Sequence, residues 1–392
     1  MSYSLSTRAM AHRNDSWHLD FSLLLPVLAL MSLGLIMVAS ASFSFADYKF
    51  DSQFMFVKRH IAYLFIGLGA GAVGFYVSPQ IWAKYSLLWL VIATVLLVAV
   101  LIPGVGLNLN GSRRWLSLGG FTLQASEIAK GAAVVFFASQ LAKHRQTLGS
   151  DWTQLAKLVA VAGLMAVLLI LEPDFGSVVV LTGTFLILLF LGGAHLGQFA
   201  LLLVSAVAAL GMLLIAAPYR LARLTAYLDP WSDEFKYNSG YQLTQSLIAF
   251  GRGEWTGVGL GQSVQKMLYL PDAHTDFVFA IYAEEFGFVG VLFLLGLYSF
   301  LVFRIMRLSK KAIAHQQWFA AYTLIGFGLL LSGQTFFNLG VNAGFLPTKG
   351  LTLPFVSYGG SSLLVCCGMV GIMLRLAHEL NRSKKTPSRV SL

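Results

Sequence analysis

Asp276 is the residue whose type and position point most directly to chemistry. It lies in a polar motif, residues 270–277, that leads into a long apolar stretch. A carboxylate at the mouth of a membrane helix is costly to place, so it indicates a functional site. Helix capping is the alternative, but it explains neither His274 nor the deeper Glu284 and Glu285. We interpret Asp276 as a candidate general base and His274 as a candidate substrate-binding neighbour.

A second polar group surrounds the start of a predicted helix at 124–143. Glu127 and Lys130 are three residues apart, so they share a helix face and can pair. Such a pair could be purely structural. The preceding segment, Arg113-Arg114-Trp115, combines two cations with an aromatic ring that could also be an interfacial anchor. Lys130 and these three residues are candidate substrate-binding residues.

A tight turn between two predicted helices holds two acids, Glu172 and Asp174. Hydrated acids are common in such hairpins, so a structural role is one interpretation. If the turn lies near Glu127, the carboxylates would instead form a metal site, because Mg²⁺ and Mn²⁺ prefer carboxylate oxygens. Glu127 and Asp174 are therefore the predicted ligands of a divalent cation.

Arg220 and Arg223 suggest that a pyrophosphate group is bound. The planar guanidinium group binds phosphate oxygens bidentately, which makes arginine a common partner for this group. Snorkelling of the side chain at the membrane interface is the alternative for either residue alone. Both arginines are candidate substrate-binding residues.

The segment 338–362 is rich in proline and glycine, which break helices. Irregular backbone at membrane depth is tolerated only where it is buried in protein or lines a wet cavity. This favours a segment that lines a substrate site. Lys349 and Ser357 are its candidate substrate-binding residues.

The elements that must position these residues are membrane helices. Of 392 residues, 57% are hydrophobic and 11% are charged, a charged share about half that of soluble domains. Apolar stretches of roughly 18 or more residues recur, the length that crosses the hydrocarbon core. We predict an all-α polytopic membrane protein. The ten predicted spans are 21–42, 59–78, 84–103, 124–143, 156–171, 174–193, 197–217, 275–305, 317–337 and 353–377.

The predicted organisation is one helical domain between two tails. Residues 1–20 form the N-terminal tail, residues 21–377 carry the spans, and residues 378–392 form a basic tail. Lys and Arg residues in the tails and in the loop after the eighth span predict that both termini are cytoplasmic. The one large loop, 218–275, then lies outside the cytoplasm and contains a short predicted helix at 241–250.

The distribution of charge excludes a nucleic-acid partner as the reason for the net charge of +10. The positive excess lies mostly in the predicted cytoplasmic tails and loops. Only four of the 17 acidic residues fall on that side: Asp15, Asp20, Asp151 and Glu379. The outer surface mixes both signs, as expected for a protein that handles a charged, lipid-linked substrate or a divalent metal.

Taken together, these segments resemble the SEDS family (shape, elongation, division and sporulation) of integral-membrane peptidoglycan glycosyltransferases. The resemblance covers about residues 21–377, and its division branch is more similar than its elongation branch. Asp272 stands where the family more often has Glu, which keeps the charge. The motifs that carry the resemblance lie in 110–130, 172–176, 219–231, 263–277 and 338–362.

The resemblance implies a ten-helix fold that polymerises lipid II into glycan strands outside the cytoplasmic (inner) membrane, at the division septum. Polyprenyl pyrophosphate would be the leaving group. It implies that Asp276 is the essential aspartate and that Glu127, Lys130 and Asp174 line a central cavity. The implied partners are a class B penicillin-binding protein, which is the division transpeptidase, and other divisome proteins. A lipid II flippase and a non-catalytic scaffold for the transpeptidase are the alternatives.

Overall fold

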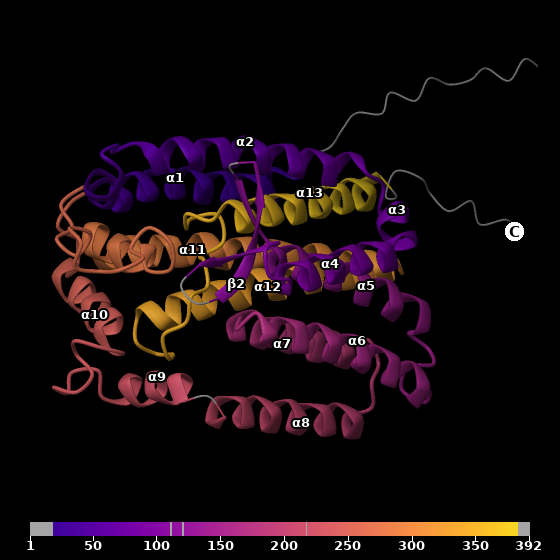
Figure 1. Ribbon diagram of the computed structural model, residues 1–392. Helices are drawn as coiled ribbons and strands as arrows, with labels where there is room; N and C mark the ends of the chain where they lie inside the picture. Colours follow the sequence, from indigo (N-terminus) through magenta and orange to yellow (C-terminus); the bar gives the residue numbers. More distant parts are fainter. Residues whose placement is uncertain (1–18, 110–111, 120, 217, 383–392) are drawn as a thin grey trace, which may run out of the picture.

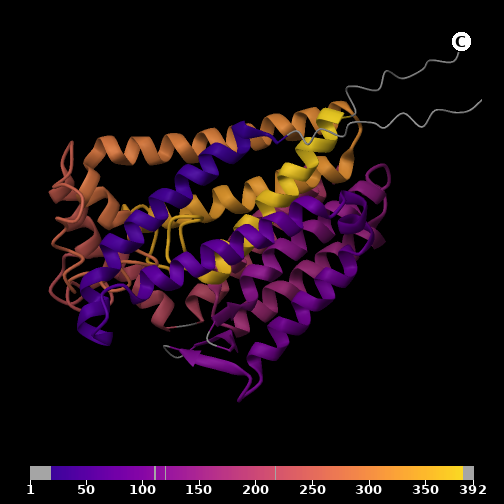
Figure 2. The same cartoon turned by 90° about the horizontal axis from the view of Figure 1, so that it is seen from above.

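The computed structural model describes residues 19–109, 112–119, 121–216 and 218–382. This part of the chain is a bundle of thirteen helices with one small sheet, shown from two directions in Figures 1 and 2. Ten of these helices have 16 residues or more: α1 (Phe21–Phe50), α2 (Met55–Tyr76), α4 (Ser86–Leu101), α5 (Ala125–His144), α6 (Trp152–Leu171), α7 (Phe175–Leu191), α8 (Leu196–Ile215), α11 (Val278–Ala314), α12 (Trp318–Asn342) and α13 (Gly360–Arg382). The short helices are α3 (Pro79–Lys84), α9 (Pro218–Leu228) and α10 (Tyr241–Gly253).

Each of the ten long helices coincides with one of the ten predicted spans. Seven of them, α1, α2, α6, α8, α11, α12 and α13, are long and apolar enough to cross a membrane, and α4 and α7 are shorter apolar helices. α5 is 20 residues long but carries charged residues, including the buried Glu127 and Lys130. The prediction of a helical polytopic membrane protein is confirmed.

Helix α8 has the smallest buried share of the seven candidate spans. Its apolar window has a mean hydropathy of 2.4, and only 6% of that window is buried within the protein. Leu196, Val204 and Ile215 are 72%, 67% and 73% exposed. A continuous apolar surface of this kind marks contact with a membrane or a partner, and α8 lies at the edge of the bundle in Figure 1.

Helices α2 and α13 approach each other closely through glycines. A Cβ atom on Gly371 would lie 1.9 Å from the carbonyl oxygen of Gly71, and one on Gly74 would lie 2.6 Å from the carbonyl oxygen of Gly368. Small residues let membrane helices pack backbone to backbone. This contact fixes α13, and with it the segment that precedes α13, against α2.

Several predicted boundaries were wrong. α1 continues to Phe50, eight residues beyond the predicted end at 42. The last span was predicted to begin at 353, but residues 353–359 are irregular and α13 begins at Gly360, because Pro354 cannot continue a helical hydrogen-bond ladder. α13 also runs to Arg382, five residues beyond the predicted end of the last span at 377.

The all-α prediction missed a three-stranded antiparallel sheet after α4. Its strands are β1 (Gly106–Leu109), β2 (Ser112–Leu118) and β3 (Phe121–Gln124), in the order β1-β2-β3. Arg113 is paired with Asn108, and Trp115 with Leu107 and Gln124. The strands are short and rich in polar residues, so they give little alternating apolar signal.

The large loop 218–275 contains two helices. The predicted helix at 241–250 is confirmed as α10, whereas α9 was not predicted. α10 packs mainly on α11. In Figure 1 both short helices lie at one end of the bundle, opposite the end of α13.

We expect alkaline phosphatase to be active when fused after Lys236 and inactive when fused after Lys311. Lys236 lies in the loop between α9 and α10, and Lys311 lies near the far end of α11. This reporter is active only outside the cytoplasm, so fusion activity normalised to fusion abundance gives the sidedness of each end. The reverse pattern would contradict the predicted orientation.

Candidate active site

Asp276 lies in the loop immediately before α11, and its side chain is half-buried. The N-cap position of α11 is occupied by Phe277, and no side chain caps this helix end. In the described part of the chain, the hydrogen bonds of Asp276 go to its main-chain carbonyl. The capping alternative is therefore wrong, and the carboxylate is left available for chemistry.

Two asparagines of α12 hold the main chain at Asp276. Asn338 Nδ2 donates to the Asp276 carbonyl at 2.8 Å and to the Leu351 carbonyl at 2.6 Å. Asn342 Nδ2 donates to the same Asp276 carbonyl at 2.9 Å, and its Oδ1 accepts from the Ala280 amide at 3.1 Å. This asparagine pair fixes the residue at position 276 relative to α11 and to the segment that contains Leu351. This contact was not predicted from the sequence.

The segment before α13 lies against the Asp276 carboxylate. A Cβ atom on Gly350 would lie 2.5 Å from Asp276 Oδ2, so a larger residue there would displace the carboxylate. Arg223 of α9 donates from Nη1 to the Thr348 carbonyl at 3.4 Å. Lys349 Nζ lies 4.9 Å from the centre of the Phe175 ring. Of the predicted residues, Lys349 therefore belongs to the segment that contacts the candidate base, and Arg223 donates a hydrogen bond to this segment.

Arg114 ties the small sheet to the turn between α6 and α7. Its Nε donates to the Glu172 carbonyl at 2.8 Å and its Nη2 to the Pro173 carbonyl at 2.7 Å. Asp174 follows, and its carboxylate accepts from the Ser177 amide at 3.2 Å and from Ser177 Oγ at 2.8 Å. Asp174 is thus the N-cap of α7.

Burial raises the pKa of the Asp276 carboxyl to about 7, and the charge of Asp272 is the next largest cause. Arg114 and Arg223 lower this pKa, and Asp174 raises it. The Asp276 carboxylate thus lies within the electrostatic field of two arginines and two acids drawn from four separate segments. A base that titrates near neutral pH is well suited to proton transfer.

His274 is part of an aromatic wall and not a second acid or base. Its ring centre lies 5.4, 4.5 and 5.7 Å from those of Phe45, Phe56 and Tyr358. Burial lowers the pKa of His274 to about 4, so the imidazole is neutral at physiological pH. Its carbonyl accepts from the Tyr358 amide at 3.0 Å, which joins the motif 270–277 to the segment before α13.

Ser357 and Arg220 complete the predicted substrate-binding set. Ser357 Oγ accepts from the Leu353 amide at 2.8 Å, so this hydroxyl stabilises the turn before α13. Arg220 belongs to α9, and its side chain lies outside the described part of the structure.

Glu127 and Lys130 form the predicted ion pair, at 2.8 Å, with both side chains buried. In the described segments, no group of three or more His, Cys, Asp or Glu side chains is arranged to hold a metal ion. Glu127 is occupied by Lys130, and Asp174 by the cap of α7. The two acids do not fit a divalent-cation site. The divalent cation itself stays a prediction.

Glu127→Gln is expected to lower the stability of the folded chain by about 3–5 kcal/mol, because it leaves the Lys130 ammonium buried without a partner. The measurement is thermal unfolding of the detergent-purified chain. The matched control, Glu127→Gln with Lys130→Met, removes both charges and should recover most of the stability. A Glu127→Gln variant as stable as the wild type would contradict the structural pair, and Mn²⁺ that raises the unfolding temperature of the wild type but not of this variant would support the metal.

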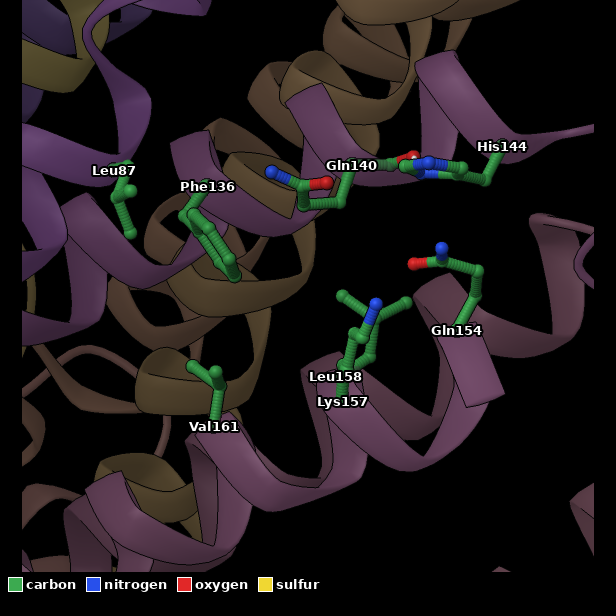
Figure 3. Close-up of a pocket in the computed structure, with 8 residues that line it drawn as sticks. All are labelled: Leu87, Phe136, Gln140, His144, Gln154, Lys157, Leu158 and Val161. Carbon is green, nitrogen blue, oxygen red and sulfur yellow. Dashed lines mark hydrogen bonds between the residues drawn. The ribbon is translucent and has the colours of Figure 1, made fainter. Parts of the chain in front are cut away.

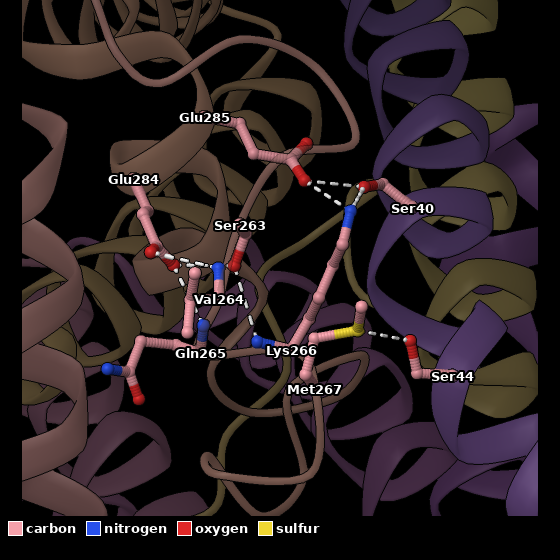
Figure 4. Close-up of polar contacts among 9 residues, drawn as sticks. All are labelled: Ser40, Ser44, Ser263, Val264, Gln265, Lys266, Met267, Glu284 and Glu285. Atoms are coloured by element: carbon pink, nitrogen blue, oxygen red, sulfur yellow. Dashed lines mark hydrogen bonds and ion pairs between the residues drawn. The ribbon is translucent and has the colours of Figure 1, made fainter.

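Glu284 and Glu285 belong to a separate buried polar cluster, drawn in Figure 4. Glu285 Oε1 accepts from Lys266 Nζ at 2.7 Å and from Ser40 Oγ of α1 at 2.6 Å. Glu284 Oε2 accepts from Ser263 Oγ at 2.5 Å. These acids connect the loop before Asp276 to α11 and α1. Their burial is therefore explained by a structural role.

Helix α11 is interrupted just after this cluster. Gly287 has φ 62° and ψ −165°, a conformation open mainly to glycine. The Val258 and Gly259 amides donate to the Glu284 and Glu285 carbonyls, each at 3.0 Å. A Cβ atom on Gly287 would lie 2.3 Å from the Gly257 amide nitrogen. The loop thus supplies the hydrogen bonds that the interrupted helix lacks.

Comparison with known proteins agrees with this arrangement of elements. The family model FTSW_RODA_SPOVE, described as "Cell cycle protein", matches residues 21–382. A protein of Saccharophagus degradans named "Probable peptidoglycan glycosyltransferase FtsW" is 51% identical over 367 residues, which is 94% of each chain.

Two solved structures share the fold. One, from work on the structural coordination of polymerization and crosslinking by a peptidoglycan synthase complex, matches with a TM-score of 0.74 and 29% identity over 92% of this chain and 98% of that one. The crystal structure of the Thermus thermophilus rod shape determining protein RodA matches with a TM-score of 0.67 and 28% identity over 92% of this chain and 97% of that one. On the family match and the 51% identity, this chain belongs to the FtsW/RodA/SpoVE family of cell cycle proteins, the SEDS family that its motifs resemble.

Proposed function

We propose that this chain is a peptidoglycan glycosyltransferase that polymerises lipid II, with Asp276 as the general base. The observation that carries the assignment of the base is a half-buried carboxylate with no capping role, held through its main chain and within the electrostatic field of Arg114 and Arg223. The name of the Saccharophagus degradans relative and the likeness to the synthase complex support the reaction class.

In the proposed reaction, a sugar hydroxyl oxygen attacks the anomeric carbon of a second lipid-linked sugar. A new C–O bond forms, the bond from that carbon to polyprenyl pyrophosphate breaks, and the hydroxyl proton moves to Asp276. The negative charge that develops on the leaving group is offset by Arg223, Lys349 and Arg114, which lie on segments around the base. A single displacement without a covalent sugar intermediate gives inversion at the anomeric carbon.

The proposed setting is the outer face of the inner membrane at the division septum, with both termini cytoplasmic. The proposed partner is a class B penicillin-binding protein that cross-links the glycan, within a larger set of divisome proteins. The relative's name supports the division role, and the solved complex that pairs polymerization with crosslinking supports the partnership.

The deciding experiment is reconstitution of the purified chain and its transpeptidase with lipid II in detergent micelles. Sidedness has no meaning in a micelle, so polymer made there cannot arise from flipping. We expect glycan strands from the wild-type complex on a polyacrylamide gel. A complex that makes no polymer but moves lipid II across vesicle membranes would instead establish the flippase. A complex that does neither would support the alternative of a non-catalytic scaffold for the transpeptidase.

The initial rate of polymerisation is expected to rise with pH through about 7. Below this value the Asp276 carboxyl is protonated and cannot accept a proton, and above it the carboxylate is present, because burial raises its pKa to about 7. Arg223 lowers this pKa, so Arg223→Gln should move the midpoint to higher pH. A rate that is flat across this pH range would argue against Asp276 as the base.

A further inference from the structure

A groove of about 230 Å³ lies between α4, α5 and α6, away from the candidate active site. Figure 3 shows the eight side chains that surround it. In Figure 1 the α5–α6 connection lies at the end of the bundle opposite α9 and α10, which is the end where α13 finishes. The groove is lined by Leu87, Phe136, Gln140, His144, Gln154, Lys157, Leu158 and Val161.

The two helices on its walls present matched faces. Phe136, Gln140 and His144 are four residues apart along α5, so they form one row. Gln154, Lys157, Leu158 and Val161 follow the spacing of one face of α6. In both rows the polar residues lie toward the α5–α6 connection and the apolar residues lie deeper in the bundle. The groove therefore has a polar mouth and an apolar floor.

The mouth carries positive charge. Lys157 is exposed, and in the described part of the chain it forms no ion pair. The nearby Asp151 carboxylate is engaged as the N-cap of α6, where it accepts from the Thr153 amide at 2.9 Å and the Gln154 amide at 3.2 Å. His144 Nδ1 lies 3.1 Å from the Gln140 carbonyl, which leaves Nε2 free of that contact.

We propose that this groove binds an anionic phospholipid, with its phosphate between Lys157, His144 and the side-chain amides of Gln140 and Gln154. The first part of an acyl chain would lie against Leu87, Phe136, Leu158 and Val161. Charge complementarity favours this occupant, because a cation with amide donors at the end of a membrane helix matches a lipid phosphate. The outward faces of α4 and α6 are exposed apolar surface, so the groove opens to the bilayer that supplies the lipid.

The test is native mass spectrometry of the full-length chain released from nanodiscs of mixed phosphatidylglycerol and phosphatidylcholine. The wild-type chain should retain phosphatidylglycerol preferentially. Lys157→Gln should reduce that retention about fivefold, the worth of one lysine near an anionic lipid surface. Lys143→Gln is the matched control, because Lys143 is an exposed lysine near the same α5–α6 connection, at the end of α5, and does not line the groove.

A second variant tests the apolar floor. Val161→Trp fills the groove without changing its charge, and it too should reduce retention of phosphatidylglycerol while the unfolding temperature stays near that of the wild type. Equal loss in Lys157→Gln and Lys143→Gln, or equal retention of both lipids by the wild type, would overturn the site. Displacement of the lipid by millimolar glycerol phosphate would show a site for free phosphate and would also overturn it.

Discussion

Asp276→Asn is expected to reduce glycan polymerisation by roughly 10²–10⁴-fold while the chain folds and binds its transpeptidase normally. Asn has nearly the same shape as Asp but cannot accept a proton from a sugar hydroxyl at neutral pH. The asparagine pair of α12 bonds to the main chain at position 276, so the substitution leaves those contacts intact. The measurement is the initial rate of polymer formation by the purified complex, normalised to the amount of folded protein.

Stability separates this result from misfolding. The folded-state pKa of Asp276, about 7, is above its ordinary value of 3.8. The contribution of Asp276 to the free energy of unfolding is therefore fully present below pH 3.8. It is lost as the pH rises through about 7. Asp276→Asn removes that loss, so it should unfold at pH 8 at a temperature no lower than the wild type.

Two further variants complete the series. Asp276→Glu should recover only part of the activity, because about one methylene of displacement disturbs the attack geometry. Asp233→Asn is the control, since Asp233 is an exposed acid of the same loop and should behave like the wild type. If an Asp276→Asn complex polymerises lipid II normally, Asp276 is not the general base.

Removing the asparagine pair should have the second largest effect. In Asn338→Leu with Asn342→Leu, the Asp276 carbonyl loses both of its donors and the segment around Leu351 loses one. A displacement of about 1 Å at a catalytic group can cost roughly 10²-fold in rate. We expect kcat to fall by about this factor with KM little changed, since the substrate contacts remain.

The control must lose a comparable hydrogen bond elsewhere. Tyr282→Phe removes the bond from the Tyr282 hydroxyl to the Gly290 carbonyl at 2.8 Å, which lies within α11 and does not involve position 276. Both variants should lose stability of about 1–3 kcal/mol per unsatisfied buried group. If the loss of kcat is no larger than in Tyr282→Phe, the pair is structural only and does not position the base.

Much of this fold is predictable from sequence because a membrane requires long apolar helices. Ten helices of 16 residues or more appear at the ten predicted spans, and the i,i+3 spacing of Glu127 and Lys130 correctly predicts their pairing. Local spacing is enough in both cases, because the interacting residues belong to one helix.

The rest depends on contacts that sequence spacing does not encode. Asn338 meets Asp276 across 62 residues, and Arg114 meets the Glu172 carbonyl across 58. Both bonds are accepted by main-chain carbonyls. Every residue has such a carbonyl, so residue type does not indicate these contacts. The divalent cation stays a prediction. Asp174 is a ligand type suited to Mg²⁺, but its oxygens already accept hydrogen bonds from Ser177, three residues on, at the start of α7.

The glycine contact between α2 and α13 has a mechanical consequence. A side-chain interface can adapt by changing rotamers, but Gly71 and Gly371 meet through backbone atoms and leave no such freedom. The two helices must therefore move as one stiff body. α8 is different, because it packs mainly on α7 and α9 and presents most of its surface to lipid. Widening of the bundle therefore meets less resistance at α8 than at the paired glycines of α2 and α13.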